Sequence, residues 1–266
     1  MPSRRIVTSG LGAVMLVRPV SAAPARRLAL LVGAPWKGET FLENGVARMQ
    51  EALIIRGFRR SDTMTSTEAT DRKTLSQRLE EIRKRIASWR EGEIFLYYDG
   101  HGMYSRATRG VPEAGLQLTG DRGDPGSRML WREVWEAIGV PHGVSVLVLP
   151  DCCHTNLLAG RLPPNVTALI MKSEPQDTLT CRTGGAMFGE GTARKRYGVI
   201  SYYAGGTVAS ARTVGDWLAR MDAAAAKDAA SGTLEPSRRP HLMIEGDAES
   251  ALPGDPVDVG ARPHTL

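Results

Sequence analysis

Short apolar runs and longer amphipathic stretches alternate along this chain. The apolar runs are short enough for buried strands and occupy residues 27–32, 94–98, 144–149 and 166–171. Between them, apolar residues recur at spacings of three and four, which predicts helices. These amphipathic stretches occupy residues 46–54, 75–89, 130–138 and 214–221. Strands that alternate with helices indicate βαβ units and a parallel sheet, so we expect a single α/β domain.

Weaker patterns predict the remaining segments. Residues 61–70 indicate a loop or an edge strand, residues 103–128 a long surface loop, and residues 184–196 a basic loop. A strand is expected at residues 197–203 and a closing strand at 241–244. The residues beyond offer little to bury, which is typical of a flexible tail. The predicted organisation is an export signal or N-terminal arm at 1–25, a folded domain at 26–246 and a tail at 247–266.

Charge changes this picture little. The 266 residues carry a formal net charge of +5. In the predicted helix at 75–89, Lys and Arg interleave with Glu, which is typical of a solvated helix face rather than a nucleic-acid site. No stretch reaches the roughly 20 apolar residues that a membrane span needs. We therefore expect neither a nucleic-acid partner nor a membrane span.

The N-terminus has a composition of its own. Residues 3–5 end in two arginines, residues 6–17 are mildly apolar, and residues 20–23 are small. This order is typical of an export signal, and the arginine pair resembles a twin-arginine signal. Arg18 interrupts the apolar run, which keeps a cytoplasmic N-terminal arm as the alternative. The pattern favours an exported or periplasmic location.

Two motifs with chemical potential follow predicted strands. Asp99-Gly100-His101-Gly102 follows residues 94–98, and Asp151-Cys152-Cys153-His154 follows residues 144–149. In open parallel sheets, ligands bind beyond the carboxyl ends of the strands, so both motifs should meet at that edge. An imidazole beside a thiol can take its proton and generate a thiolate nucleophile. The order and the spacing of about fifty residues match the caspase arrangement of His and Cys.

The same residues allow other interpretations. Taken separately, a Gly-His-Gly sequence is typical of a loop, and a Cys after an apolar strand is typical of a small core residue. A zinc site formed by His101, Cys152, Cys153 and His154 is disfavoured, because consecutive ligands in one turn do not converge easily. The adjacent cysteines could also form a vicinal disulfide, and Cys181 receives no role. The joint occurrence favours catalysis, with no metal.

Backbone donors near the two motifs complete the expected chemistry. Gly102 can approach a ligand closely because it has no side chain. Its N–H and that of Cys153 are candidates for an oxyanion hole. A short helix predicted after the cysteine would stabilise a thiolate at its N-terminus.

On these motifs the chain resembles the caspase-like cysteine peptidases. The likeness is nearer to metacaspases and bacterial orthocaspases than to animal caspases. Those families have Tyr-Ser-Gly-His-Gly and Asp-x-Cys-His-Ser-Gly, where this chain has Tyr98-Asp99-Gly100-His101-Gly102 and Asp151-Cys152-Cys153-His154-Thr155. The resemblance covers residues 26–245 and implies a caspase-like three-layer α-β-α sandwich with a mostly parallel central sheet.

The resemblance also implies an activity, that of a thiol protease with cysteine-type endopeptidase activity. It makes His101 the general base, Cys153 the nucleophile and Asp151 part of a pocket for Arg or Lys before the cut. Asp99 stands where the families have Ser, and this second acid near His101 could either act on the imidazole or add to the pocket. The alternative for Asp151 is a turn or capping residue. No cofactor is implied, and the acidic clusters that bind calcium in many metacaspases are not evident.

The implied partner is a protein or peptide with a basic residue before the cut. Candidate self-cleavage positions lie where the resemblance implies a cut between large and small subunits: Arg182, Arg194, Lys195 and Arg196. Two other function classes stay open, a catalytically silent caspase-like scaffold and a hydrolase of small amides. The sequence predicts neither the natural substrate nor the oligomeric state.

Overall fold

The computed structural model describes most of the chain. The described residues are 26–36, 39, 41–68, 70–106, 112–120, 124–172, 185–189 and 191–256. The predicted export signal or arm at 1–25 lies outside them. Every statement below concerns the described residues.

A mostly parallel sheet forms the centre of the molecule. Its main strands lie in the order β10-β7-β6-β3-β1-β2. Their bounds are β1 (Arg27–Ala34), β2 (Thr63–Ser66), β3 (Gly92–Arg106), β6 (Val144–Asp151), β7 (Val166–Met171) and β10 (Leu242–Glu245). Only the pairing of β10 with β7 is antiparallel along this order. The predicted strands at the sheet centre and the closing strand are confirmed.

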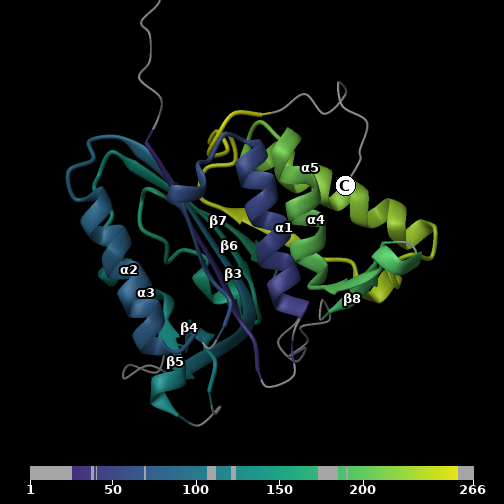
Figure 1. Ribbon diagram of the computed structural model, residues 1–266, viewed down its shortest axis with the longest axis horizontal. Coiled ribbons are helices and arrows are strands. Elements are labelled where there is room, and N and C mark those ends of the chain that lie inside the picture. The colour runs from purple at the N-terminus through teal and green to yellow at the C-terminus, as the bar shows by residue number, and fades with distance from the viewer. Residues whose placement is uncertain are drawn as a thin grey trace, which may run out of the picture.

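Helices cover both faces of the sheet (Figure 1). The helices α2 (Arg72–Ile86) and α3 (Trp131–Ile138) lie on one face, and α1 (Phe41–Ile55), α4 (Val199–Thr207) and α5 (Val214–Ala230) lie on the other. Side chains of β1 alternate between the two cores, because successive residues of a strand point to opposite faces. Leu28 and Leu30 pack with α2 and α3, whereas Leu31 packs with α1. The fold is the expected three-layer sandwich.

Local signals explain where the helices begin and end. The Asp71 carboxylate caps α2 by accepting a hydrogen bond from the Thr74 N–H at 2.7 Å. Gly139 ends α3 with φ 58°, a left-handed conformation that suits glycine. The exposed face of α2 carries ion pairs such as Arg78–Glu81. None of the described helices is both long and apolar enough to cross a membrane.

The strand that leads to the histidine motif is longer than predicted. β3 continues through His101 to Arg106 and pairs with β4 (Pro112–Gln117), which pairs in turn with β5 (Arg128–Leu130). The expected surface loop at 103–128 therefore contains a small antiparallel extension of the sheet. Burial explains the difference, because Leu116 and Met129 pack into the core below it.

The predicted strand at 197–203 is wrong, because most of this segment forms α4. Its aromatic and β-branched residues favour a strand locally. In the fold, Val199 and Ile200 are buried against the core, and the Ser201 N–H donates to the Asp151 carboxylate at 2.9 Å. Tertiary contacts thus override the local preference.

Part of the predicted basic loop also has regular structure. β8 (Ala186–Phe188) and β9 (Lys195–Tyr197) pair as a small antiparallel sheet. Phe188 is buried and stacks on Tyr202 of α4, with ring centroids 3.8 Å apart. The hairpin is thereby attached to the helix that follows it.

The first half of the predicted tail packs against the domain instead of extending from it. Leu252 is buried, and the carbonyls of Leu252, Pro253 and Gly254 accept hydrogen bonds from the guanidinium of Arg56. Asp255 forms an ion pair with Arg27. The segment has few apolar residues, but a buried arginine holds its backbone. Residues 257–266 lie outside the described part of the chain.

Candidate active site

Neighbouring parallel strands bring the two predicted motifs to one edge of the sheet. Asp99 of β3 and Asp151 of β6 are paired across the two strands. His101 and Cys153 each stand two residues beyond their aspartate. Their backbones meet, because a Cβ atom added to Gly102 would lie 2.7 Å from the Cys153 nitrogen. The motifs are therefore adjacent as predicted, and only glycine fits at position 102.

His101 has two partners that the sequence did not indicate. Its Nε2 lies 3.0 Å from both carboxylate oxygens of Glu39. Its ring stacks on Trp36, with centroids 3.5 Å apart and planes inclined by 7°. Both residues follow β1, which is the neighbour of β3 on the other side from β6. The sequence signal that could have indicated Glu39 is a carboxylate soon after a strand that ends at this edge of the sheet.

The two adjacent cysteines differ sharply. Cys152 is a free, buried thiol, and burial raises its pKa well above the ordinary value. A thiol of this kind is inert. Cys153 is disulfide-bonded in this structure. Because Cys152 is free, the vicinal disulfide considered from the sequence is wrong, and Cys181, the third cysteine, lies outside the described residues.

The turn after the cysteines is shorter than expected. A 3-10 helix covers only Thr155–Leu158, so the predicted helix N-terminus is too short to stabilise a thiolate substantially. His154 adopts a left-handed conformation with φ 64°. Thr155, which replaces the usual Ser, is fully buried, and its hydroxyl accepts a hydrogen bond from the Met171 N–H at 2.9 Å. This departure from the family pattern has a structural role.

Asp99 and Asp151 form a buried cluster with two hydroxyl groups. The Ser201 hydroxyl lies 2.8 Å from Asp99 Oδ2 and 2.5 Å from Asp151 Oδ2. The Tyr97 hydroxyl lies 2.9 Å from Asp99 Oδ2 and 2.6 Å from the Ser201 hydroxyl. No sequence pattern indicated Tyr97 or Ser201 as members of this cluster. Ser201 belongs to α4, fifty residues beyond Asp151, and no local pattern connects them.

Burial perturbs both acids. It raises the pKa of Asp151 to about 6, an effect that the hydrogen bonds from Ser201 reduce. Burial and the neighbouring Asp151 charge raise the pKa of Asp99 well above its usual range. Two carboxylates in one dry site cannot both ionise easily, so the pair holds a proton more readily than free aspartates do.

Asp151 also has the capping role that the sequence left open. Ser201 lies in the first turn of α4, and its N–H donates to the Asp151 carboxylate. Gly198, which precedes α4, lies beside the acid pair, because a Cβ there would be 3.0 Å from Asp151 Oδ2 and 3.3 Å from Asp99 Oδ1. A larger residue at 198 would press directly on the carboxylates.

The candidate self-cleavage positions are only partly described. Arg194, Lys195 and Arg196 are exposed, and the last two belong to β9, which ends one residue before Gly198. The Arg196 guanidinium lies over the Phe41 ring, 4.5 Å from its centroid. Arg182 lies outside the described residues. Self-cleavage at these positions stays a prediction.

The described residues offer no group of three or more His, Cys, Asp or Glu side chains that could hold a metal ion.

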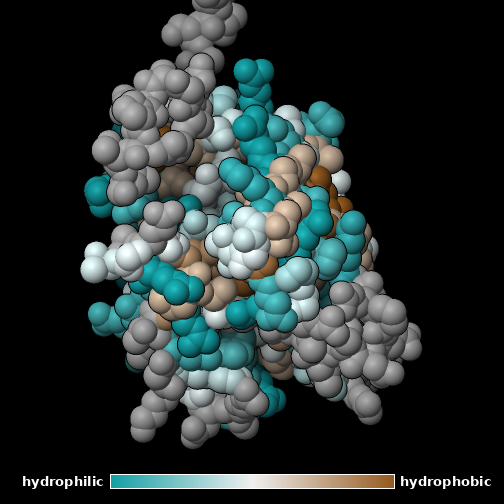
Figure 2. All heavy atoms as spheres, turned by 90° about the vertical axis from the view of Figure 1, so that its right-hand side faces the viewer, coloured by the Kyte–Doolittle hydropathy of each residue, from teal (hydrophilic) through white to brown (hydrophobic). Residues whose placement is uncertain are grey.

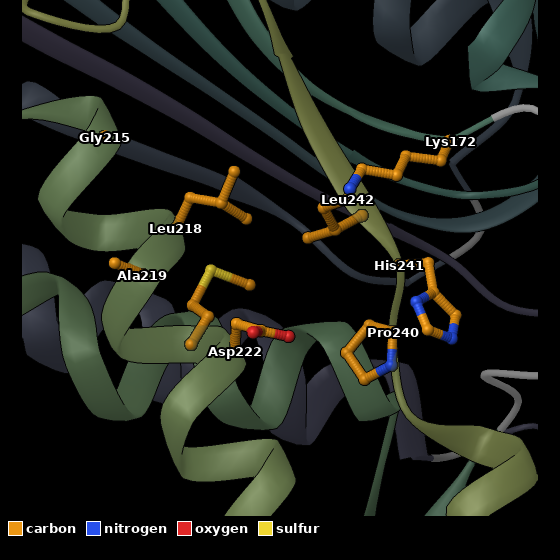
Figure 3. Close-up of a pocket in the computed structure, with 9 residues that line it drawn as sticks. Lys172, Gly215, Leu218, Ala219, Asp222, Pro240, His241 and Leu242 are labelled. Carbon is orange, nitrogen blue, oxygen red and sulfur yellow. The ribbon is translucent and has the colours of Figure 1, made fainter.

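A cavity of about 280 Å³ opens away from the two motifs, between α5 and β10 (Figure 3). Its walls include Leu218, Leu242 and the charged Lys172 and Asp222. β7 separates β10 from β6, so this cavity is distinct from the acid pair. On the side shown in Figure 2, hydrophilic and apolar residues are interspersed.

Comparison with known proteins identifies the fold. A solved structure of pro-sf-caspase-1 superposes with a TM-score of 0.55 at 10% sequence identity, covering 84% of this chain and 92% of that one. The Drosophila initiator caspase Dronc gives a TM-score of 0.54 at 8% identity, covering 86% and 83%. No family model and no curated protein matches the sequence. The chain therefore has a caspase-like α/β fold.

Proposed function

We propose that this protein is a caspase-like cysteine endopeptidase of the metacaspase or orthocaspase type that cleaves after Arg or Lys. The observation that supports it most is the buried pair Asp99 and Asp151, each two residues before a proposed catalytic residue. Two residues of extended chain span about 6–7 Å. Each acid is therefore separated from its proposed catalytic residue by about the length of a Lys or Arg side chain. Paired carboxylates would attract such a cation and reject an acidic side chain.

The reaction begins once Cys153 is reduced. His101 takes the Cys153 proton, and the thiolate attacks the backbone carbonyl carbon of the substrate's Arg or Lys residue. The negative oxygen formed there is stabilised by the N–H groups of Gly102 and Cys153. His101 then protonates the departing amine as the C–N bond breaks, which leaves a thioester. Water loses a proton to His101, attacks the thioester and releases the acid, and the proton returns to Cys153.

A catalytically silent scaffold is the second candidate. It is favoured by two observations: Cys153 is disulfide-bonded, and Asp151 has a capping contact that needs no substrate. The two functions differ in one measurable property. After reduction, a peptidase reacts covalently with a peptide that ends in an arginine electrophile, whereas a scaffold stays unlabelled.

The test compares fluorogenic peptides that end in Arg, Lys or Asp, in reducing buffer with and without calcium. Wild type should cleave the Arg and Lys peptides. Cys153→Ala should abolish cleavage, whereas the matched Cys152→Ala, at a buried thiol, should keep it. Absence of cleavage and of labelling by the reduced wild-type protein would refute the peptidase.

The acid pair makes the specificity testable. Asp99→Asn or Asp151→Asn should lower kcat/KM for Arg peptides at least about 30-fold, since losing one partner of a buried charge pair costs about 2 kcal/mol or more. Asp222→Asn, a matched change beside the separate cavity on α5, should leave kcat/KM unchanged. Equal effects of all three variants would exclude the pair as the pocket.

A further inference from the structure

We infer that Glu39 is a positioning residue that fixes the tautomer and orientation of His101, so that the site works as Cys153, His101 and Glu39 together. This inference rests on the proposed function. The relevant contact is the approach of His101 Nε2 to both oxygens of the Glu39 carboxylate, at 3.0 Å each.

The contact defines which ring nitrogen carries a proton. An ionised carboxylate only accepts hydrogen bonds, so Nε2 must donate to Glu39. In the neutral ring, Nδ1 then holds the lone pair. Nδ1 is therefore the atom that can take the proton of Cys153. The opposite tautomer would direct the lone pair toward Glu39 and leave no base for the thiol.

Glu39 is itself held in place. The Trp36 N–H donates to Glu39 Oε2 at 3.0 Å, and the Glu39 N–H donates to the Trp36 carbonyl at 2.9 Å. These reciprocal bonds fix the carboxylate at the end of β1. His101 and Glu39 are partly shielded, with side chains 31% and 26% exposed. A partly shielded pair of this kind is screened less by solvent than a surface pair.

Trp36 also contacts His101, on the face of the imidazole ring. Its indole lies parallel to the imidazole, with the two centroids 3.5 Å apart. The face of an indole attracts a cation. Glu39 and Trp36 therefore hold the His101 ring from two directions, Glu39 at Nε2 and Trp36 on the ring face.

Neighbouring strands explain why these groups meet. β1, β3 and β6 run parallel and adjacent, and Glu39, His101 and Cys153 follow or extend their carboxyl ends in that order. The sheet thus places an acid, a base and a nucleophile at one edge. β3 contains His101, whereas Glu39 follows β1 and Cys153 follows β6.

The experiment measures kinetics and the ring nitrogens in the full-length, reduced protein. Glu39→Gln should lower kcat for Arg peptides about 10²–10⁴-fold, the usual contribution of a correctly held base. KM should change less than kcat, since Glu39 contacts His101 directly and acts on Asp99 only through its charge. Glu39→Asp should restore much of the rate. Glu43→Gln, an exposed change of the same charge in the first turn of α1, is the matched control.

Histidine-selective ¹⁵N spectra give a readout that needs no substrate. The His101 signals, assigned by comparison with His101→Gln, should show a proton on Nε2 in wild type and a mixture of tautomers in Glu39→Gln. A wild-type ring protonated on Nδ1 alone, or a kcat equal in Glu39→Gln and Glu43→Gln, would overturn the inference. If the wild type cleaves no peptide, the proposed function fails, while the spectra still decide whether Glu39 fixes the tautomer.

Discussion

Arg56 and the acid pair of Asp99 and Asp151 are both buried, but their charges are satisfied to very different degrees. Arg56 is 1% exposed, and its guanidinium donates to six backbone carbonyls. Asp99 and Asp151 are 2% and 7% exposed. Among the described residues, the hydroxyls of Tyr97 and Ser201 and one backbone N–H serve both carboxylates.

The difference separates a buried charge that the fold satisfies fully from a buried pair that it satisfies only in part. A cation surrounded by carbonyls needs no further partner, and Arg56 ties the C-terminal segment to the domain. Burial raises the pKa of both acids, and repulsion by the Asp151 charge raises the pKa of Asp99 further. A bound guanidinium or ammonium would remove that repulsion. Under the proposed function, the acid pair would therefore be stabilised by its ligand, whereas Arg56 needs none.

The largest expected effect concerns Arg56 and its contribution to the stability of the fold. Arg56→Met should lower the free energy of unfolding by about 3–5 kcal/mol, because it leaves buried carbonyls without donors. Urea denaturation measures this loss. Limited proteolysis should also show earlier cleavage near Leu252, which Arg56 holds through its carbonyl.

Arg60→Met is the matched control, since Arg60 is exposed. It should change the free energy of unfolding by less than about 0.5 kcal/mol. Equal losses in the two variants would show that the carbonyl contacts of Arg56 add nothing to stability.

The pH dependence of stability probes the acid pair. The folded protein keeps the Asp151 proton up to a pKa of about 6, whereas the unfolded chain releases it near the ordinary value of about 4. Between these values the folded state binds more protons, so stability falls as pH rises, by about 3 kcal/mol in total. Asp99, whose pKa is also raised by burial and by the Asp151 charge, adds a decline of the same sign.

The measurement is urea denaturation from pH 5 to 8 in wild type and Asp99→Asn. Burial lowers the pKa of His154, which acts with the opposite sign in this range, so the difference between the two proteins is the informative quantity. Asp99→Asn removes the like charge and should flatten the decline. A stability that rises with pH more steeply in wild type than in Asp99→Asn would contradict the coupling.

The sequence predicted the sheet and the two strand-end motifs because both depend on local patterns. Apolar runs define β1, β3, β6 and β7, and the parallel order brings their carboxyl ends together. His101 and Cys153 could therefore be assigned to one edge from these patterns alone. The roles of Asp151 and Asp99 in a pocket came from the family resemblance, and the structure adds that the two residues are paired across β3 and β6.

The missing members of the site come from elements that such patterns do not connect. Ser201 reaches Asp151 from a helix whose sequence resembles a strand, and its position depends on how α4 packs. Glu39 follows β1 in a polar segment that resembles an ordinary loop. Arg56 fixes a segment poor in apolar residues through backbone carbonyls, and no hydropathy pattern reveals such contacts.

The smallest expected effect tests how much the hydroxyl of Tyr97 contributes to stability through its hydrogen bond to Asp99. Tyr97→Phe removes a hydroxyl that lies 2.9 Å from Asp99 and leaves the ring in the core. Its cost should be about 1 kcal/mol at pH 5 and should approach about 2 kcal/mol at pH 8, because a hydrogen bond to a charged acceptor is stronger than one to a neutral carboxyl. Tyr104→Phe, at a ring 48% exposed, is the control and should be neutral at both pH values. An equal loss at pH 5 and pH 8 would mean that Asp99 does not ionise in this range. In that case Asp99 would be structural in the same sense as Arg56.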